Sequence, residues 1–370
     1  MANEQGAWQP DWAVLPGEIL AEALQERRMS QSELARRMDR PVKTINEIVN
    51  GKAAITPDTA IQLERAIGIS ARLWNGLEIR YREYVALERA QRELESFAHW
   101  ARDFPTRDLV RFGLIPEDRD RSKGGRVGAL LSYFGVSNPS AWERQWLAPS
   151  ASFRESPTFT AAPKAVAAWL RWGELQAGSI VAATYDARAF RQAVDEFRSL
   201  TRRDPLLIID RIKDRAAAAG VVVMLTPELQ GTHLSGAARW LASDRALIQL
   251  SLRHKTDDQF WFSLFHEADH ILEGDKRDYV DPAASGEAQT DSSEREADTF
   301  ARNILIPPEA YAVLVSAGDF SESTIRMFAD AEGVAPGIVL GRLQRDELVA
   351  TSHFNNLKKS INWTAVAPER

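Results

Sequence analysis

The sequence of 370 residues contains no cysteine. This absence excludes disulfides, cysteine nucleophiles and thiolate metal sites, so any metal must be held by histidine and carboxylate ligands. Histidine is itself scarce, at six residues. No apolar run comes near the ~20 residues that a membrane-spanning helix needs. The first residues, MANEQGAWQPDW, lack the basic and apolar regions of a signal peptide. We therefore expect a cytoplasmic protein with no membrane partner.

The overall charge argues against a general polyanion binder, because it is −6 at pH 7. The charge is nevertheless uneven along the chain. Between residues 27 and 52 there are seven basic side chains and three acidic ones, a local net of +4. A basic patch of this kind suits contact with phosphates, although a solvated helix face has the same composition.

The pattern of apolar residues predicts a mainly α fold with a small β-sheet, an α+β protein. Residues 204–219 and 257–272 have helical periodicity, whereas residues 221–229, 236–241 and 246–252 are typical of strands. The expected domains are a lead-in (1–16), a helix-turn-helix (17–70), a connecting or dimerisation helix (71–104), a helical middle region (105–200), a metallopeptidase domain of zincin-like fold (201–350) and a tail (351–370). Four tryptophans of the middle region are expected in its core: Trp142, Trp146, Trp169 and Trp172.

The sharpest chemical pattern is the string His266-Glu267-Ala268-Asp269-His270. Residues four apart share one face of a helix, so His266 and His270 can bind the same ion. Glu267 lies beside them and can accept a proton from the attacking water and return it to a leaving group. A pair of structural histidines is the plainer alternative, and a third ligand has to decide between them.

Residues 291–307 supply that third ligand. Glu294 follows His270 by 24 residues, and Asp298 lies one helical turn after Glu294. This spacing suits one carboxylate on the metal and a second, Asp298, that orients a histidine through its other ring nitrogen. Glu296 and Asp269 are competing ligands, but Glu296 is two residues from Glu294 and Asp269 points off the face of the two histidines.

These strings, FHEADHIL and then EREADTFARNILIP, resemble the ImmA/IrrE family of metallopeptidase-like proteins. The resemblance covers residues 200–310 well and 100–200 more loosely. It implies that His266, His270 and Glu294 bind Zn²⁺ and that Glu267 is the catalytic acid and base. One position departs from the family, where the residue before the second histidine is often small. Here it is Asp269, and an extra carboxylate is expected to shift the pKa of water at the metal or restrict substrate entry.

Residues 19–68 resemble an Xre-type helix-turn-helix of the HigA antitoxin branch. Helices are expected at 19–28, 30–38, 42–50 and 56–67, the second opened by Ser30 and Glu33 as a capping box and the third ended by Gly51. In such an element the third helix enters the major groove. The expected base contacts are Lys43, Thr44 and Asn46, and the expected phosphate contacts are Gln31, Arg40 and Lys52.

Two functions follow as hypotheses. The first is a DNA-binding transcription regulator, bound as a homodimer to a double-stranded operator, whose zinc metalloprotease domain cleaves a protein partner such as a repressor. The second is a toxin–antitoxin component: a HigA-like antitoxin and autorepressor whose zinc domain is a non-catalytic sensor or interaction module. His233 and Arg239, near the strand at 236–241, are weaker candidates for stabilising an oxyanion.

Overall fold

The computed structural model describes residues 13–117, 123–147, 162–251, 255–274, 279–282 and 292–361. The chain divides into two compact units, and each is described by itself. One contains residues 1–99 and 120–127, and the other contains residues 100–119 and 128–370. Most of residues 149–163 and 274–293 lie outside the described residues.

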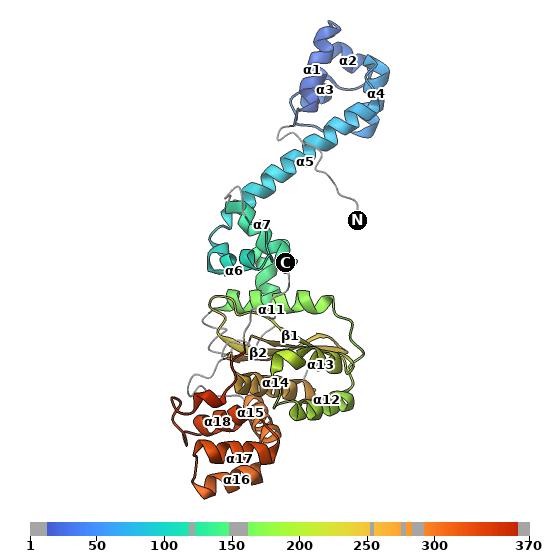
Figure 1. Ribbon diagram of the computed structural model, residues 1–370. Coiled ribbons are helices and arrows are strands. Elements are labelled where there is room, and N and C mark those ends of the chain that lie inside the picture. The colour runs from blue at the N-terminus through green and yellow to red at the C-terminus, as the bar shows by residue number, and fades with distance from the viewer. Residues whose placement is uncertain are drawn as a thin grey trace. The chain divides into compact units, whose positions relative to one another are not determined.

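The first unit is a bundle of short helices followed by a long one (Figure 1). Its helices are α1 (Pro16–Glu26), α2 (Gln31–Arg37), α3 (Val42–Val49), α4 (Pro57–Ile67) and α5 (Ala71–Ser96). The short helices share one core, in which Leu20, Leu24, Leu34, Ala35, Met38, Ile45 and Ile48 are all buried together. Trp74 at the start of α5 is fully buried in the same cluster, so the first turns of the long helix belong to this unit.

The caps of these helices follow from the sequence. The Ser30 hydroxyl accepts a hydrogen bond from the Glu33 backbone N–H at 3.1 Å, which is half of the expected capping box. The Glu33 carboxylate forms ion pairs with Arg36 and Arg37 on its own helix. Gly51, after α3, has a positive φ of 69°, a conformation that favours glycine.

The second unit surrounds one mixed sheet. Its strands are β1 (Val221–Leu225), β2 (Leu234–Ala242), β3 (Arg245–Leu250) and β4 (Tyr279–Pro282), in the order β1-β3-β2-β4. β1 and β3 are parallel, and the other two pairs are antiparallel. The first three strands were expected, whereas β4 lies in a segment without the alternation that marks a strand.

Helices cover both faces of this sheet (Figure 1). Alternate residues of β3 separate the faces: Gln249 donates a hydrogen bond to the Trp169 carbonyl of α11, whereas Ile248 and Leu250 join the core that contains α14. The helices of the unit are η1 (Trp100–Asp103), α6 (Thr106–Arg111), α7 (Lys123–Phe134, of which residues 128–134 belong to this unit), α8 (Pro139–Trp142), η2 (Glu143–Leu147), α11 (Pro163–Gly178), α12 (Ala187–Ser199), α13 (Pro205–Ala217), α14 (Asp257–Leu272), α15 (Ser292–Leu305), α16 (Pro308–Ala317), α17 (Glu322–Glu332), α18 (Pro336–Arg345) and η3 (Asn355–Leu357).

Two groups of residues show where the helical parts of this unit pack. The four tryptophans expected in a core are buried, Trp142 and Trp169 completely. Part of the expected tail is also buried, because Leu357 and Ile361 join the main core. Residues 351–361 of the expected tail are therefore part of the packed second unit.

Candidate metal centre and nucleic-acid interface

Helix α14 carries the HExxH string, and its bounds are those expected from the sequence, residues 257–272. Thr256 precedes the helix, and Asp257 and Asp258 occupy its first turn, where carboxylates complement the helix dipole. Phe260, Trp261, Leu264 and Phe265 bury the helix in the main core. His266 and His270 are therefore fixed on a helix that is itself fixed.

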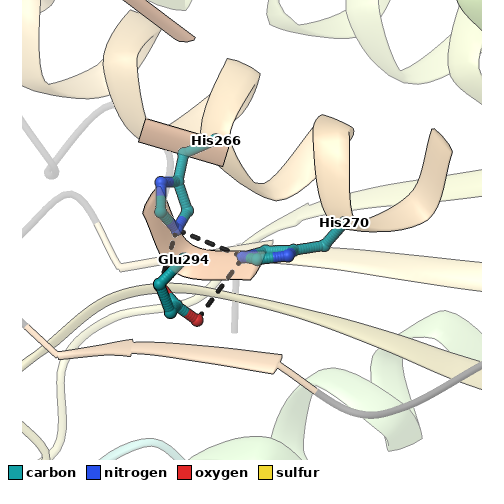
Figure 2. Close-up of side chains that lie close together, drawn as sticks. All are labelled: His266, His270 and Glu294. Carbon is teal, nitrogen blue, oxygen red and sulfur yellow. Dashed lines mark hydrogen bonds and ion pairs between the residues drawn. The ribbon is translucent and has the colours of Figure 1, made fainter. Parts of the chain in front are cut away.

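The structure brings the three expected ligands together (Figure 2). His266 Nε2 lies 3.2 Å from Glu294 Oε2 and 3.3 Å from His270 Nε2, and His270 Nε2 lies 3.5 Å from Glu294 Oε1. A zinc ion that binds tetrahedrally with bonds of about 2.05 Å separates neighbouring ligand atoms by roughly 3.3 Å. Both the donor atoms and their separations therefore fit a zinc ion.

The two histidines are held in the form that a metal requires. Burial, and then the neighbouring His266, lower the pKa of His270 to about 2, so its imidazole is neutral at physiological pH. His266 directs Nδ1 at Asp298 Oδ1, 3.1 Å away, which leaves Nε2 for the metal. The expected role of Asp298, orientation of a histidine, is consistent with this contact.

Asp298 is in turn held by two arginines that the sequence analysis missed. Its Oδ2 accepts from Arg345 at 2.9 Å and from Arg302 at 3.4 Å. Burial raises the pKa of Asp298, but the His266 hydrogen bond and both arginines outweigh it, so the pKa is lowered. Arg302 follows Asp298 by four residues, a spacing that could have revealed it. Arg345 is 47 residues away and gives no local signal.

Glu267 follows His266 on α14, beside the ligand cluster, and is fully buried. A methyl group added at Gly236 on β2 would lie 2.5 Å from Glu267 Oε1 and 2.9 Å from its Cγ. The carboxylate thus occupies the space that a side chain at position 236 would need. Sequence reasoning missed Gly236, although a glycine inside a strand can mark such a close approach.

The competing ligands lie elsewhere. Among the residues that the structure describes, only His266, His270 and Glu294 form a cluster with metal-binding geometry. Asp269 is buried, which raises its pKa, and Arg191 opposes that shift. Glu273 lies close enough to Glu296 for a side-chain hydrogen bond, and the Asp269 charge also acts on it. Asp269 and Glu296 therefore belong to an acidic group outside the ligand cluster.

The weaker candidates do not join the cluster either. His233 is exposed and lies 3.4 Å from Glu228. The Arg239 guanidinium lies 5.6 Å from the ring centroid of Trp146, which indicates a packing role.

The expected DNA-contacting residues lie on and around α2 and α3. Lys43 and Asn46 are exposed on α3, and Thr44 is partly exposed. Lys43 is 3.8 Å from Glu47, and Asn46 donates to Gln31 at 3.3 Å, which links the first turn of α2 to α3. Gln31 and Arg40 are partly exposed and Lys52 is exposed; Arg40 donates to Gln62 of α4 at 2.6 Å. The six side chains therefore lie on α2 and α3 or in the segments that follow these helices.

Comparison with known proteins divides the chain into two recognised parts. Residues 20–74 match the helix-turn-helix family, and residues 216–335 match the IrrE N-terminal-like domain of peptidase M78. An uncharacterised HTH-type transcriptional regulator of Escherichia coli K12, YddM, is 41% identical over 63 residues, which are 17% of this chain and 67% of that protein.

Two solved structures are also similar to a part of the chain. A putative antidote protein of a plasmid maintenance system from Nostoc punctiforme is 32% identical and covers 23% of this chain and 92% of its own, with a TM-score of 0.22. A HigA-family addiction module antidote protein from Coxiella burnetii is 34% identical and covers 22% of this chain and 91% of its own, with a TM-score of 0.21.

Among the described helices, none has the length and apolar character needed to cross a membrane.

Proposed function

We propose that this chain, which belongs to the HTH-type transcriptional regulators through residues 20–74 and carries an IrrE N-terminal-like domain at 216–335, is a cytoplasmic DNA-binding regulator whose zinc centre hydrolyses peptide bonds in a protein partner. The observation that carries the hydrolytic half is the His266, His270 and Glu294 cluster with Glu267 beside it.

The chain's own residues supply most of the chemistry of such a reaction. Zinc, when bound, acts as a Lewis acid toward the scissile carbonyl and toward water. Glu267 accepts a proton from the attacking water and passes it to the departing amine nitrogen. Asp298 holds the Nδ1 proton of His266, which keeps Nε2 free for the metal. Glu294 is the most exposed member of the cluster, at 21%, so the site is open on its side.

Glu267→Gln tests the hydrolytic role, because the amide keeps the size of the side chain and loses its basicity. Purified protein should retain stoichiometric zinc by elemental analysis and lose at least 100-fold in cleavage of partner proteins encoded beside its gene, in line with the loss of a general base. Glu296→Gln is the matched control, since that carboxylate lies outside the cluster. The proposal would be refuted by undiminished cleavage by the Glu267 variant. It would also be refuted if the protein is purified without zinc and does not bind added zinc.

A second function is favoured by the burial of Glu267, whose exposure is zero. A fully buried base suits a zinc domain that senses or binds rather than cleaves, in an antitoxin or autorepressor. In that case His266→Ala would leave operator binding and toxin neutralisation intact, and a toxin gene would adjoin this one.

The DNA arm of the proposal rests on α3 and on the basic patch around it. We expect a homodimer on a double-stranded operator, because one helix-turn-helix makes few base contacts and dimers read two half-sites. Helix α5 is a candidate surface for that dimer, since it exposes four large apolar side chains, Leu73, Ile79, Val85 and Leu87.

A further inference from the structure

A cavity of about 340 Å³ lies in the second unit, apart from the ligand cluster. Its walls come from α14, α15, α18 and the segment at 351–358. The apolar part of the lining is formed by Phe262, Leu305, Ile306 and Ile338. Its volume falls in the range of small-molecule sites, which combine an apolar lining with a few convergent polar groups.

The charged part of the lining is strongly one-sided. Four cations border the cavity, Arg302, Arg342, Arg345 and Lys358, against the single carboxylate of Asp258. Lys358 Nζ lies 2.8 Å from Asp258 Oδ2, so this pair largely neutralises itself. The other three cations are guanidinium groups around a partly enclosed apolar space. Arg302 and Arg345 pair with Asp298, and Arg342 lies 3.9 Å from Asp346 and donates to the backbone carbonyls of Arg302 and Ile306. Because a guanidinium is always charged and presents several N–H donors in one plane, it favours carboxylate and phosphate ligands.

Two of these arginines connect the cavity to the metal centre. Arg345 and Arg302 hold Asp298 Oδ2, and Asp298 Oδ1 orients His266. Phe262 forms a second link, because its ring lies 4.7 Å from the Arg345 guanidinium and 6.1 Å from the His266 ring centroid. Arg345 is 41% exposed, so its side chain has room to turn toward another anion.

We propose that this cavity binds a small organic anion, a carboxylate or phosphate monoester with an apolar body, and that the bound anion weakens the metal centre by drawing Arg345 away from Asp298. The binding part stands on the cavity alone. The coupling part rests on the zinc centre proposed above. An arginine that donates to the ligand has fewer N–H groups for Asp298, so His266 is held less firmly.

Binding is tested with zinc-free full-length protein by calorimetry at constant ionic strength. The probes are benzoate, phenyl phosphate, inorganic phosphate and neutral benzamide. Benzoate or phenyl phosphate should bind saturably and at least tenfold more tightly than benzamide, and the stronger of the two identifies the acidic group. Inorganic phosphate should bind more weakly than phenyl phosphate, because it does not use the apolar lining. Equal binding of benzamide, or no saturation by either organic anion, would overturn the proposal.

Gln259 provides matched variants, because it lines the cavity and is partly exposed. Gln259→Glu adds a negative charge without changing size and should weaken anion binding at least tenfold, whereas Gln259→Met should change it less than threefold. Equal binding by wild type and Gln259→Glu, with both folded by circular dichroism, would show that the anion binds elsewhere.

The coupling is measured by repeating the titration with zinc-loaded protein and by titrating zinc at saturating anion. The anion should lower the zinc affinity roughly tenfold. Because linkage is reciprocal, it should also bind zinc-free protein roughly tenfold more tightly than zinc-loaded protein. Tight anion binding with unchanged zinc affinity would remove the coupling and leave the cavity. Failure of zinc binding in the absence of anion would count against the metal centre alone.

Discussion

Removal of the Asp298 carboxylate is the most direct test of how the metal centre is organised. Asp298→Ala leaves all three ligands, His266, His270 and Glu294, in place and deletes only the group behind one of them. His266 then loses the acceptor of its Nδ1 proton. Its ring can rotate and change tautomer, and both changes take Nε2 away from the metal. We expect weaker zinc binding with the fold intact.

The size of the effect can be estimated in two ways. Loss of a group that orients a metal-binding histidine typically costs 10–100-fold in metal affinity, which is about 1.4–2.7 kcal/mol. Independently, a hydrogen bond to a charged partner contributes about 1.5–3 kcal/mol. The 3.1 Å contact between His266 and Asp298 is such a bond, and Asp298 is only 23% exposed. Both estimates predict a fall of between one and two orders of magnitude.

Zinc affinity is measured by competition with a chromophoric chelator at pH 7. Asp330→Ala is a suitable control, because Asp330 also pairs with an arginine, Arg202, at 2.6 Å, on the exposed surface of the same unit. The control should bind zinc like the wild type, and Asp298→Asn should fall between wild type and Asp298→Ala. A zinc affinity for Asp298→Ala within threefold of the wild type would refute the reasoning.

Three further predictions follow. Gly236→Ala should displace Glu267 and reduce cleavage about 100-fold while zinc remains bound; Gly76→Ala, where nothing lies within 4 Å of the added methyl, should leave the kinetics unchanged. Burial raises the pKa of Asp257 from 3.8 to about 6, so its charged form destabilises the fold above pH 6 and not below pH 4. In chemical denaturation of zinc-free protein, the free energy of unfolding of Asp257→Asn relative to wild type should therefore rise by up to about 3 kcal/mol between pH 4 and pH 7. An equal difference between the two proteins at both pH values would contradict this. Lys43→Ala should weaken binding to the DNA upstream of its own gene and lower the salt slope by about 1; gel-shift curves identical to wild type at every salt concentration would exclude Lys43 from the interface.

The parts of the fold that the sequence predicted well are those set by local periodicity. The bounds of α14 and the shared face of His266 and His270 follow from the 3.6-residue repeat, since neither needs knowledge of another element. The choice of Glu294 over Glu296 rests on its spacing to Asp298, which is again a property of one helix, and on the resemblance to the ImmA/IrrE family. Local rules together with that resemblance therefore predicted the ligand cluster of the described structure.

The parts that could not be predicted depend on contacts between distant segments. Arg345 reaches Asp298 across 47 residues, and nothing in the sequence around either one marks the partner. The same holds for β4, which has no alternating pattern of its own and is a strand because it pairs with β2. The segment after residue 350 looked like a tail, yet the Lys359 backbone N–H donates to the Asp257 carboxylate at 2.9 Å.

The contacts of α14 show that the unit that carries the ligand cluster extends beyond residues 216–335. Gly337 and Gly341 of α18 lie so close to α14 that an added methyl would meet Asp257 Oδ1 at 2.9 Å and Asp258 Oδ2 at 2.6 Å. The backbone and the side chain of Asp257 both bond to the backbone of Lys359. The Asp257 N–H donates to the Lys359 carbonyl at 2.9 Å, and the Asp257 carboxylate accepts from the Lys359 N–H.

A fragment that ended at residue 335 would keep all three ligands and lose α18. It would lose the buried side chains of Ile338, Val339, Leu340 and Leu343, each of which stabilises the fold by about 1.5–3 kcal/mol through burial. It would also lose Arg345, the closer of the two arginines on Asp298. The ligands therefore come from α14 and α15, but their orientation depends on α18 and on the chain up to residue 361. A zinc site measured in a shorter fragment would understate the affinity of the whole protein.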